Sequence, residues 1–362
     1  MKKKIILCMS LIVLIVILVF SVVLIKKSRE DADSSNSANM KNTEGIYTVL
    51  TLEDEIKDDT IWCGTFQLIW NDLKNDLAKQ DIVFLPKQLK VVENLNKETF
   101  KKEYLTDKYY YKKIGIPSLE LKKEIENAIK DKFNEKSNIL DNFEWNGKSE
   151  NDYFLYVMLK KEFEFEKAFE DLDKGAFGNF NNISYFGIKD EDSNEVLKQV
   201  EVLYYDSKDD FAIKLKTKQE DEVILCKNPK GETFNEIYDR INEKRDDYKG
   251  DVFLQEGEKL KVPNIKINQK KEFKEIENNS FYFSTGKTYH IDKAIQTIEF
   301  DLDRKGGRIK SEAGMMALLQ DSISMRTERT FYLDDTFVIF LKEEGKDKPY
   351  FAGKITDITK FQ

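Results

Sequence analysis

The chain has 362 residues and a formal net charge of −8. Beyond position 27 it carries 54 basic and 67 acidic residues, a net charge of −13, which should repel nucleic acid and anionic lipid. Of the three cysteines, Cys63 and Cys226 lie in this part of the chain. They are too few for a disulfide framework, so we expect two buried free thiols, with one disulfide as the alternative.

Residues 1–27 are predicted to form a single transmembrane anchor. The run Ile5–Ile25 contains no charged residue and is long enough, at helical rise, to cross a hydrocarbon layer of about 30 Å. Lysines precede the run, and the lysines that follow it are soon balanced by acids, so the positive-inside rule places the rest of the chain outside the cell. No small-residue cleavage site ends the run, which favours an uncleaved anchor over a signal peptide.

Residues 28–45 and residues 46–362 differ in composition. The first stretch is rich in Ser, Asn and Asp and has little to bury, which predicts a disordered stalk. The second contains few prolines and no low-complexity run, and its length suits one large core. We therefore expect one extracellular domain over residues 46–362, attached to the cell membrane through the stalk.

Residues 61–78 are predicted to form a buried core helix. Large apolar side chains recur there at helical spacing: Trp62, Phe66, Ile69, Trp70, Leu73 and Leu77. A stripe of this kind can also line a ligand groove, but packing is the more frequent role of Trp and Phe at helical spacing.

A second helix is expected after Pro117, with Ser118 as its N-cap. Its apolar residues recur four apart: Leu121, Ile125, Ile129 and Phe133. The following run Tyr153–Leu159 is apolar throughout, which predicts a central strand.

From position 198 the pattern changes to β. Three β-rich runs separated by polar turns predict a meander over residues 200–228, and a further helix is expected after Thr233. Residues 260–267 predict another strand, in which Pro263 suits a sheet edge or a strand start.

The C-terminal part is also predicted to be β. Residues 294–302 alternate apolar and polar side chains, as a half-buried strand requires, until Gly306 and Gly307 end the pattern. Residues 331–341 and 350–355 are β-rich and joined by a polar turn, which predicts a β-hairpin.

The segment between Gly307 and this hairpin is unusual. A gap of more than twenty residues inside a compact domain indicates either a functional loop or an element that was missed. Residues 312–319 are good helix formers, which favours a surface helix. Residues 320–329 show no amphipathic period, which favours an exposed loop offered to another protein. Both alternatives stay open.

The residues give no support for an enzyme or a cofactor site. His290 is the single histidine, no Gly-x-Ser-x-Gly elbow is present, and a lone histidine is more often structural or solvated. Metal-ligand spacing of His and Cys is absent, and Gly306-Gly307 lacks the Lys-Ser/Thr of a phosphate loop. Acidic residues are numerous, so paired-acid hydrolysis cannot be judged by counting, but no pair stands out in the sequence by an apolar setting that would separate two pKa values.

Several segments over residues 118–355 resemble the serpin family in the family's order. Ser311-Glu312-Ala313 stands in the place of the family's Thr-Glu-Ala hinge, and Phe165 stands where a Trp is usual. The remaining similarities are to the helix across the front of the large sheet, the Val-Pro-Lys-Phe strand and the closing strands: Ile125–Leu140, Leu260–Ile265, Tyr332–Leu341 and Phe351–Ile355.

The resemblance implies an α+β fold with a large mixed β-sheet, packed helices and an exposed reactive-centre-type loop. It implies a monomer that inhibits a serine or cysteine protease by becoming cleaved and trapping the acylated protease. The hinge would be Ser311, Glu312, Ala313 and Gly314. The scissile bond would lie near Met325-Arg326 or Arg326-Thr327. Arg326 before the cut would suit a trypsin-like protease, and Met325 an elastase-like one.

The chain also departs from the family. The stretch before Pro117 has room for fewer elements than a full serpin carries. Arg308 and Lys310 precede the hinge, and Met315 and Met316 replace a run of alanines, which raises the barrier to inserting the cut loop as a strand. The alternative function is therefore a non-inhibitory surface module that keeps the fold for binding or structure.

Overall fold

The computed structural model describes residues 43–362 except 147–148, 150, 190–193 and 308–328. The described residues belong to one compact unit, Asn42–Gln362. Within these ranges no helix has both the length and the apolar character that a bilayer span requires. The predicted anchor and nearly all of the predicted stalk lie outside the described residues.

The largest sheet has seven strands in the order β1-β2-β19-β18-β10-β9-β8. It is mixed, because β1 and β2 are parallel while the other neighbours are antiparallel. In sequence order its strands are Tyr47–Thr48, Thr60–Cys63, Val200–Ser207, Asp210–Lys216, Asp221–Lys227, Phe337–Glu343 and Phe351–Ile355. The predicted meander is confirmed as β8 to β10, and an α+β fold with a large mixed sheet is confirmed.

A second sheet has the strand order β17-β11-β7-β6. In sequence order its strands are β6 Glu170–Phe177, β7 Phe180–Ile188, β11 Lys259–Pro263 and β17 Thr330–Tyr332. The prediction of one strand over residues 260–267 is wrong, because the chain changes sheet after Pro263. Pro263 is the last residue of β11, and β11 lies between β17 and β7. The run 331–341 is likewise divided between β17 and β18, and only β18 and β19 form the predicted hairpin.

Two smaller sheets contain the remaining long strands. One has the order β12-β15-β16-β5, with the bounds β5 Phe163–Glu164, β12 Ile265–Glu272, β15 Ile295–Asp303 and β16 Gly306–Gly307. The other pairs β3 (Tyr110–Gly115) with β4 (Phe154–Leu159). The predicted half-buried strand is confirmed as β15, where Ile298, Phe300 and Leu302 are buried. A short hairpin, β13 (Ser280–Tyr282) and β14 (Thr288–His290), joins β12 to β15.

The helices follow the predicted caps more closely than the predicted lengths. The Ser118 hydroxyl accepts from the Leu121 amide at 3.1 Å, and Thr233 caps α6 in the same way, which confirms both starts. The helices are α2 Thr65–Asp72, the π-helical turn Leu73–Ala78, α3 Lys90–Asn96, α4 Leu119–Phe133, α5 Asn194–Lys198 and α6 Phe234–Asp247.

The predicted helix over residues 61–78 is wrong at its beginning. Trp62 lies in β2, and the helix starts only after Gly64. An added Cβ at Gly64 would clash with the Phe100 ring, so a glycine is needed where the chain leaves the sheet. Trp62 is still fully buried, and its indole N–H donates to the Leu50 carbonyl at 3.1 Å. The aromatic stripe is therefore core.

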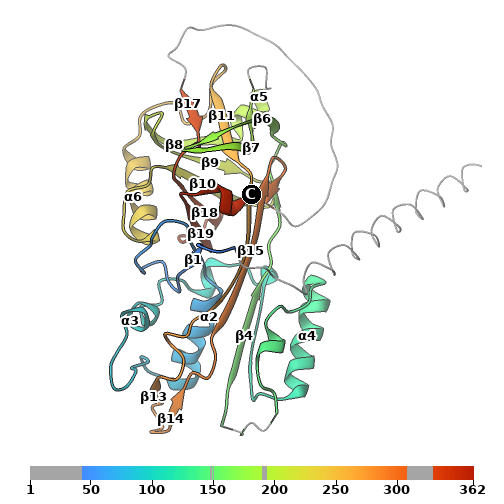
Figure 1. Cartoon of the computed structure of the whole chain (residues 1–362), viewed down its shortest axis with the longest axis vertical. Coiled ribbons are helices and arrows are strands. Elements are labelled where there is room, and N and C mark those ends of the chain that lie inside the picture. The colour runs from blue at the N-terminus through green and yellow to red at the C-terminus, as the bar shows by residue number, and fades with distance from the viewer. Residues whose placement is uncertain (1–42, 147–148, 150, 190–193, 308–328) are drawn as a thin grey trace, which may run out of the picture. The chain divides into compact units, whose positions relative to one another are not determined.

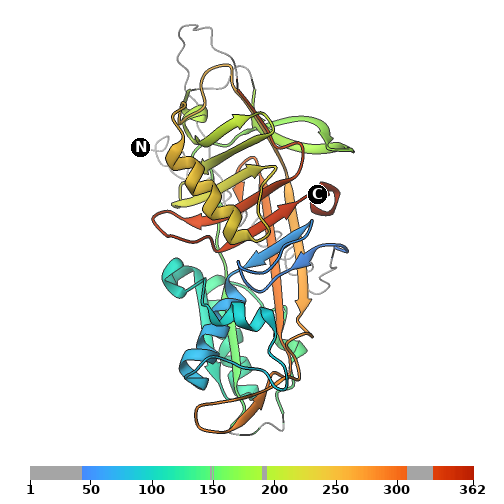
Figure 2. The same cartoon turned by 90° about the vertical axis from the view of Figure 1, so that its left-hand side faces the viewer.

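Most of the core lies against the seven-stranded sheet. Figure 2 shows α6 (yellow) lying along this sheet, where the Tyr238 and Phe340 rings meet edge to face with centroids 5.4 Å apart. Cys63 and Cys226 are buried in this core and are free, as predicted.

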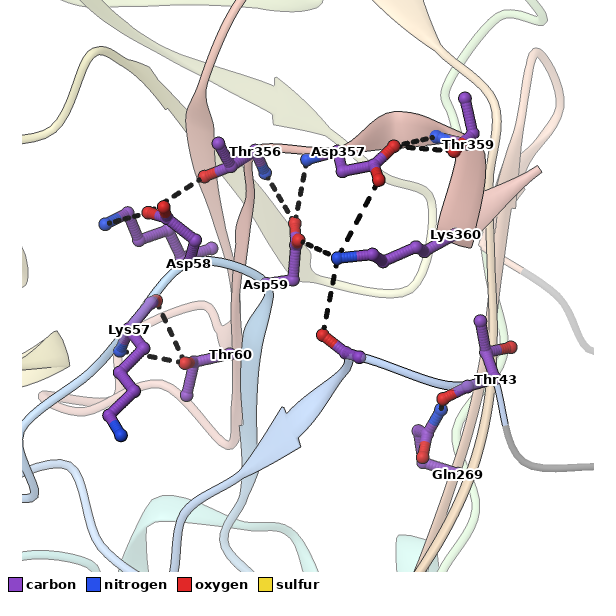
Figure 3. Close-up of polar contacts among 12 residues, drawn as sticks. Thr43, Lys57, Asp58, Asp59, Thr60, Gln269, Thr356, Asp357, Thr359 and Lys360 are labelled. Carbon is purple, nitrogen blue, oxygen red and sulfur yellow. Dashed lines mark hydrogen bonds and ion pairs between the residues drawn. The ribbon is translucent and has the colours of Figure 1, made fainter.

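The first described residues are fixed to the last ones (Figure 3). The buried Asp59 carboxylate accepts from the amides of Thr356 and Asp357 and from the Lys360 ammonium at 2.6–2.9 Å. The Gln269 side chain of β12 donates to the Thr43 carbonyl at 2.8 Å. The start of the described chain is therefore held both by the C-terminal residues and by β12.

Candidate functional site

The edges of β4 and β15 define the candidate site. β4 pairs with β3, and β15 pairs with β12 from Ile295 to Leu302. Among the described residues, no strand pairs with the second edge of β4, and β15 has a second partner only at Leu302 and Asp303. The expectation that β4 is a central strand is therefore not met by the described residues. Its uniformly apolar sequence reflects two covered faces rather than two paired edges.

The two-residue strand β16 lies between β15 and β5. Gly307 stands opposite Leu302 of β15 and opposite Phe163 of β5, so β16 is antiparallel to both neighbours. An added Cβ would collide with the Phe163 carbonyl at Gly306 and with the Phe163 ring at Gly307. Gly306 also has φ +146°, which disfavours other residues. The two glycines thus do not simply end β15, as predicted, but begin a new strand beside it.

Both faces of β4 are covered. Phe154 and Tyr156 pack on the apolar side of α4, while Val157 and Leu159 pack against the main core. Figure 1 shows α4 beside β4 and α2 close to it on the other side. Any strand added beside β4 would therefore have alternate side chains on the α2 side and on the α4 side.

The chain after α4 links these elements on the α4 side. The Asn138 amide donates to Glu299 of β15 at 2.6 Å, and Lys270 of β12 donates to the Asn142 side chain at 2.7 Å. Leu140–Asn142 forms a short 3-10 turn in this stretch. The segment therefore connects the β3–β4 pair, through α4, to the β12–β15 pair.

Arg329, the first described residue after residue 328, is held firmly by its side-chain contacts. Its guanidinium makes a bidentate ion pair with Glu258 at 2.6 and 2.8 Å. Its other N–H groups donate to the Tyr248 hydroxyl and to the carbonyls of Asp251 and Phe253 at 2.6–3.2 Å. All five guanidinium donors thus have an acceptor, and β17 begins from a firmly held residue.

A buried ion cluster lies under the junction of β4 and β5. The Lys161 ammonium contacts Asp221 of β10 and Glu343 of β18, each at 2.7 Å, and the side chains are 4%, 0% and 7% exposed. The Tyr350 hydroxyl donates to Asp221 at 3.1 Å, and the Thr106 hydroxyl donates to Glu343 at 2.7 Å. A lysine between two carboxylates leaves this buried cluster with a net charge of −1.

The two carboxyls of the cluster titrate differently. Burial raises the pKa of Asp221 above its ordinary value, although Lys161 and Tyr350 act against burial. Burial also acts on Glu343, but there the hydrogen bonds from Lys161 and Thr106 outweigh it and hold the pKa below its ordinary value. Glu343 is therefore the more firmly ionised partner of Lys161.

None of the predicted site residues lies among the described residues. The hinge Ser311–Gly314 and the scissile candidates Met325–Thr327 lie outside the described residues. Phe165 is buried, and its ring meets Phe169 edge to face at 4.9 Å. His290 is exposed on β14.

Arg329 and Lys161 were not identified from the sequence as residues that hold the chain near the segment 308–328. One signal was present, because four of the seven arginines in a lysine-rich chain lie between positions 304 and 329. Arginine is the residue that forms planar bidentate pairs, as Arg329 does. Lys161 had no comparable signal among 59 basic residues.

The sequence matches no family model and no curated protein. The solved structures similar to this chain include serpins. Serpin48 of the insect Tenebrio molitor has 11% identity and a TM-score of 0.42, with 70% of this chain and 78% of that chain covered. Human thyroxine-binding globulin in complex with thyroxine has 11% identity and a TM-score of 0.43, with 79% and 94% covered.

Proposed function

We propose that residues 46–362 act as a membrane-anchored, serpin-like inhibitor of a serine or cysteine protease. The observation that carries the proposal is the position of β16, which begins a strand between β15 and β5 immediately before residue 308. The predicted hinge follows within a few residues. A segment cut near residue 326 would remain attached at this point, beside the edges of β4 and β15.

The proposed chemistry is acyl transfer followed by strand addition. The protease nucleophile attacks the carbonyl carbon of Met325 or Arg326 and forms an acyl bond to it. The peptide bond breaks, and the next residue leaves with a free amine. The acylated segment then adds to the edges of β4 and β15, where its backbone gains hydrogen bonds on both sides. Arg329 keeps the other new chain end fixed to β17.

The register of β16 specifies where the hinge would go. Gly307 faces Leu302 and Phe163, and both ladders are antiparallel. If they continue without a bulge, Ala313 would lie opposite Gln296 of β15 and Val157 of β4. Ala313 and Ser311 would then share the core side with Val157 and the buried Gln296. A small residue suits that side, because α2 packs close to β4.

The same register changes the expected effect of the basic residues before the hinge. Arg308 would lie opposite Asp301 and Glu162. Lys310 would lie opposite Glu299 on one side and opposite Lys160 on the other. Cross-strand pairs of opposite charge contribute roughly 0.2–1 kcal/mol each. Arg308 would therefore favour the added strand, whereas the attraction of Lys310 to Glu299 would be offset by its repulsion from Lys160.

The test is to mix the full chain with trypsin-like, elastase-like and papain-like proteases. An inhibitor gives a covalent complex on a denaturing gel, and the cleaved chain melts at a much higher temperature than the intact one. Ala313→Glu places a charge on the core side and should convert the chain into a plain substrate. Glu312→Ala, on the other side of the same strand, is the matched control and should still inhibit.

The alternative is a non-inhibitory surface module, favoured by the bulk of Met315 and Met316. Met315 would fall on the core side of the added strand, opposite Leu155 of β4. In that case every protease leaves a cleaved chain without a complex, and the melting temperature does not change on cleavage.

A further inference from the structure

The second edge of β4 has no strand partner among the described residues, so the backbone ladder on that side does not fix its position. β16 lies between β15 and β5. At that end the two flanking strands are therefore two strand spacings apart, about 10 Å. Only residues 160–162 separate β5 from β4. Whatever holds these three residues thus sets the distance between the β4 edge and β15.

Two consecutive lysines hold this junction from opposite sides. The Lys160 ammonium donates to the Phe133 carbonyl at 3.1 Å and to Glu135 at 2.7 Å, both at the C-terminal end of α4. The Lys161 ammonium reaches Asp221 and Glu343 on the seven-stranded sheet. The opposite directions follow from the extended chain, in which neighbouring side chains point to opposite faces.

The Lys161 ammonium is held in one position by buried groups, unlike the ammonium of a surface ion pair. Its ammonium lies 4.0 Å from the Tyr109 ring centroid and 4.9 Å from that of Tyr350. Two carboxylates and two aromatic faces therefore surround one buried charge. Displacing Lys161 would leave Asp221 and Glu343 buried without their cation, which strongly opposes any movement of the junction.

We propose that Lys160 and Lys161 are positioning residues that hold the β4–β5 edge at the distance from β15 that admits one added strand. This inference deepens the proposed inhibitory function and rests on it for its purpose. The contacts that Lys160 and Lys161 make, together called the clamp, are independent of that purpose. The clamp predicts that the β4 edge loosens locally when the lysines lose their partners, whether or not a protease is ever trapped.

The experiment uses the full chain and four variants. Lys161→Met removes the central charge, and the triple variant Lys161→Met, Asp221→Asn, Glu343→Gln removes all three charges so that the chain still folds. Lys160→Met tests the α4 side. Lys214→Met is the matched control, because Lys214 also bridges two carboxylates, Glu201 at 2.7 Å and Glu222 at 3.2 Å, but lies within the seven-stranded sheet.

The first measurement is amide hydrogen exchange. In the Lys160 variant, in the triple variant and in Lys161→Met if it folds, residues 154–159 should exchange about tenfold faster than in the unaltered chain and in Lys214→Met. The strands β2 and β19, which carry none of the substitutions, should exchange as in the unaltered chain. Uniform loosening of the whole domain, or unchanged exchange at β4, would overturn the clamp.

The second measurement is the rise in melting temperature when the segment 308–328 is cut. The clamp predicts a smaller rise in the Lys160 and triple variants than in Lys214→Met, because the added strand meets a displaced edge. An equal rise in all variants overturns the positioning role. If the unaltered chain itself shows no rise, the inhibitory proposal fails, and the exchange measurement still decides the clamp.

Discussion

Replacing Arg329 by alanine should destabilise the domain by about 3–5 kcal/mol, the usual cost of removing one partner of a buried ion pair. The Arg329 and Glu258 side chains are 13% and 6% exposed, so solvent screens the pair little. After the substitution Glu258 keeps one hydrogen bond, from the Gln255 amide at 2.9 Å, but loses its cation. The carbonyls of Asp251 and Phe253 lose a donor as well.

Two comparisons separate this cost from a general effect of losing a charge. Arg329→Met combined with Glu258→Gln should recover most of the loss, because no charge is then buried alone. Arg245→Ala is the control, since Arg245 is 52% exposed and its ion pair with Glu201 is long, at 3.9 Å. That variant should lose less than about 1 kcal/mol.

The assay is urea denaturation of the full chain followed by tryptophan fluorescence, with the slope against urea compared between variants. A change in midpoint at constant slope reports the free energy of unfolding. The reasoning is refuted if Arg329→Ala loses no more than Arg245→Ala. It is equally refuted if the double variant is as unstable as Arg329→Ala.

The remaining predictions concern topology, the core and pH. Protease shaving of intact cells should release the domain of residues 46–362, and recovery of the domain only after lysis would contradict the outward orientation. Trp62→Ala and Trp70→Ala should each cost about 3–5 kcal/mol, and an unchanged melting temperature would show that the side chain is not core. Asp221 has a raised pKa in the folded chain, so its contribution to the free energy of unfolding is lost as pH rises above 3.8. The difference in this free energy between the unaltered chain and Asp221→Asn should therefore shrink over that rise. Glu343 has a lowered pKa, so its contribution to the free energy of unfolding is lost as pH falls below 4.5. The stability difference between the unaltered chain and Glu343→Gln should therefore grow as pH rises to 4.5 and then stay constant. If urea denaturation gives the same dependence of stability on pH for both variants, both assignments are refuted.

Local signals in the sequence were sufficient to predict an element wherever residues within that element or next to it determine where it begins and ends. The cap at Ser118 and the four-residue spacing of Leu121, Ile125 and Ile129 predicted α4, and those three side chains are buried. The alternation in residues 294–302 predicted β15 for the same reason. In each case the periodicity of the side chains and the end signals agree.

The sequence failed where the chain changes partner without changing composition. Residues 260–267 are β-rich throughout, so the change of sheet after Pro263 left no trace in the pattern. Trp62 fitted the helical spacing of Phe66 and Trp70, although β2 and α2 bury these side chains in different clusters. Sheet membership depends on contacts between distant segments, which a single pattern does not record.

The same limit applies to the candidate site, and it affects the functional argument directly. From the sequence, Arg308 and Lys310 counted against insertion, because bulky side chains near the hinge raise the barrier to insertion. If the two ladders of Gly307 continued in register, both residues would fall on the α4 side, where Asp301 and Glu299 of β15 would face them and Lys160 would face Lys310. Whether a charge hinders or helps strand addition thus depends on register, and register became available only through the two glycines of β16. The bulk of Met315 remains the feature that opposes insertion in that register, which makes Met315→Ala the substitution expected to increase inhibition most.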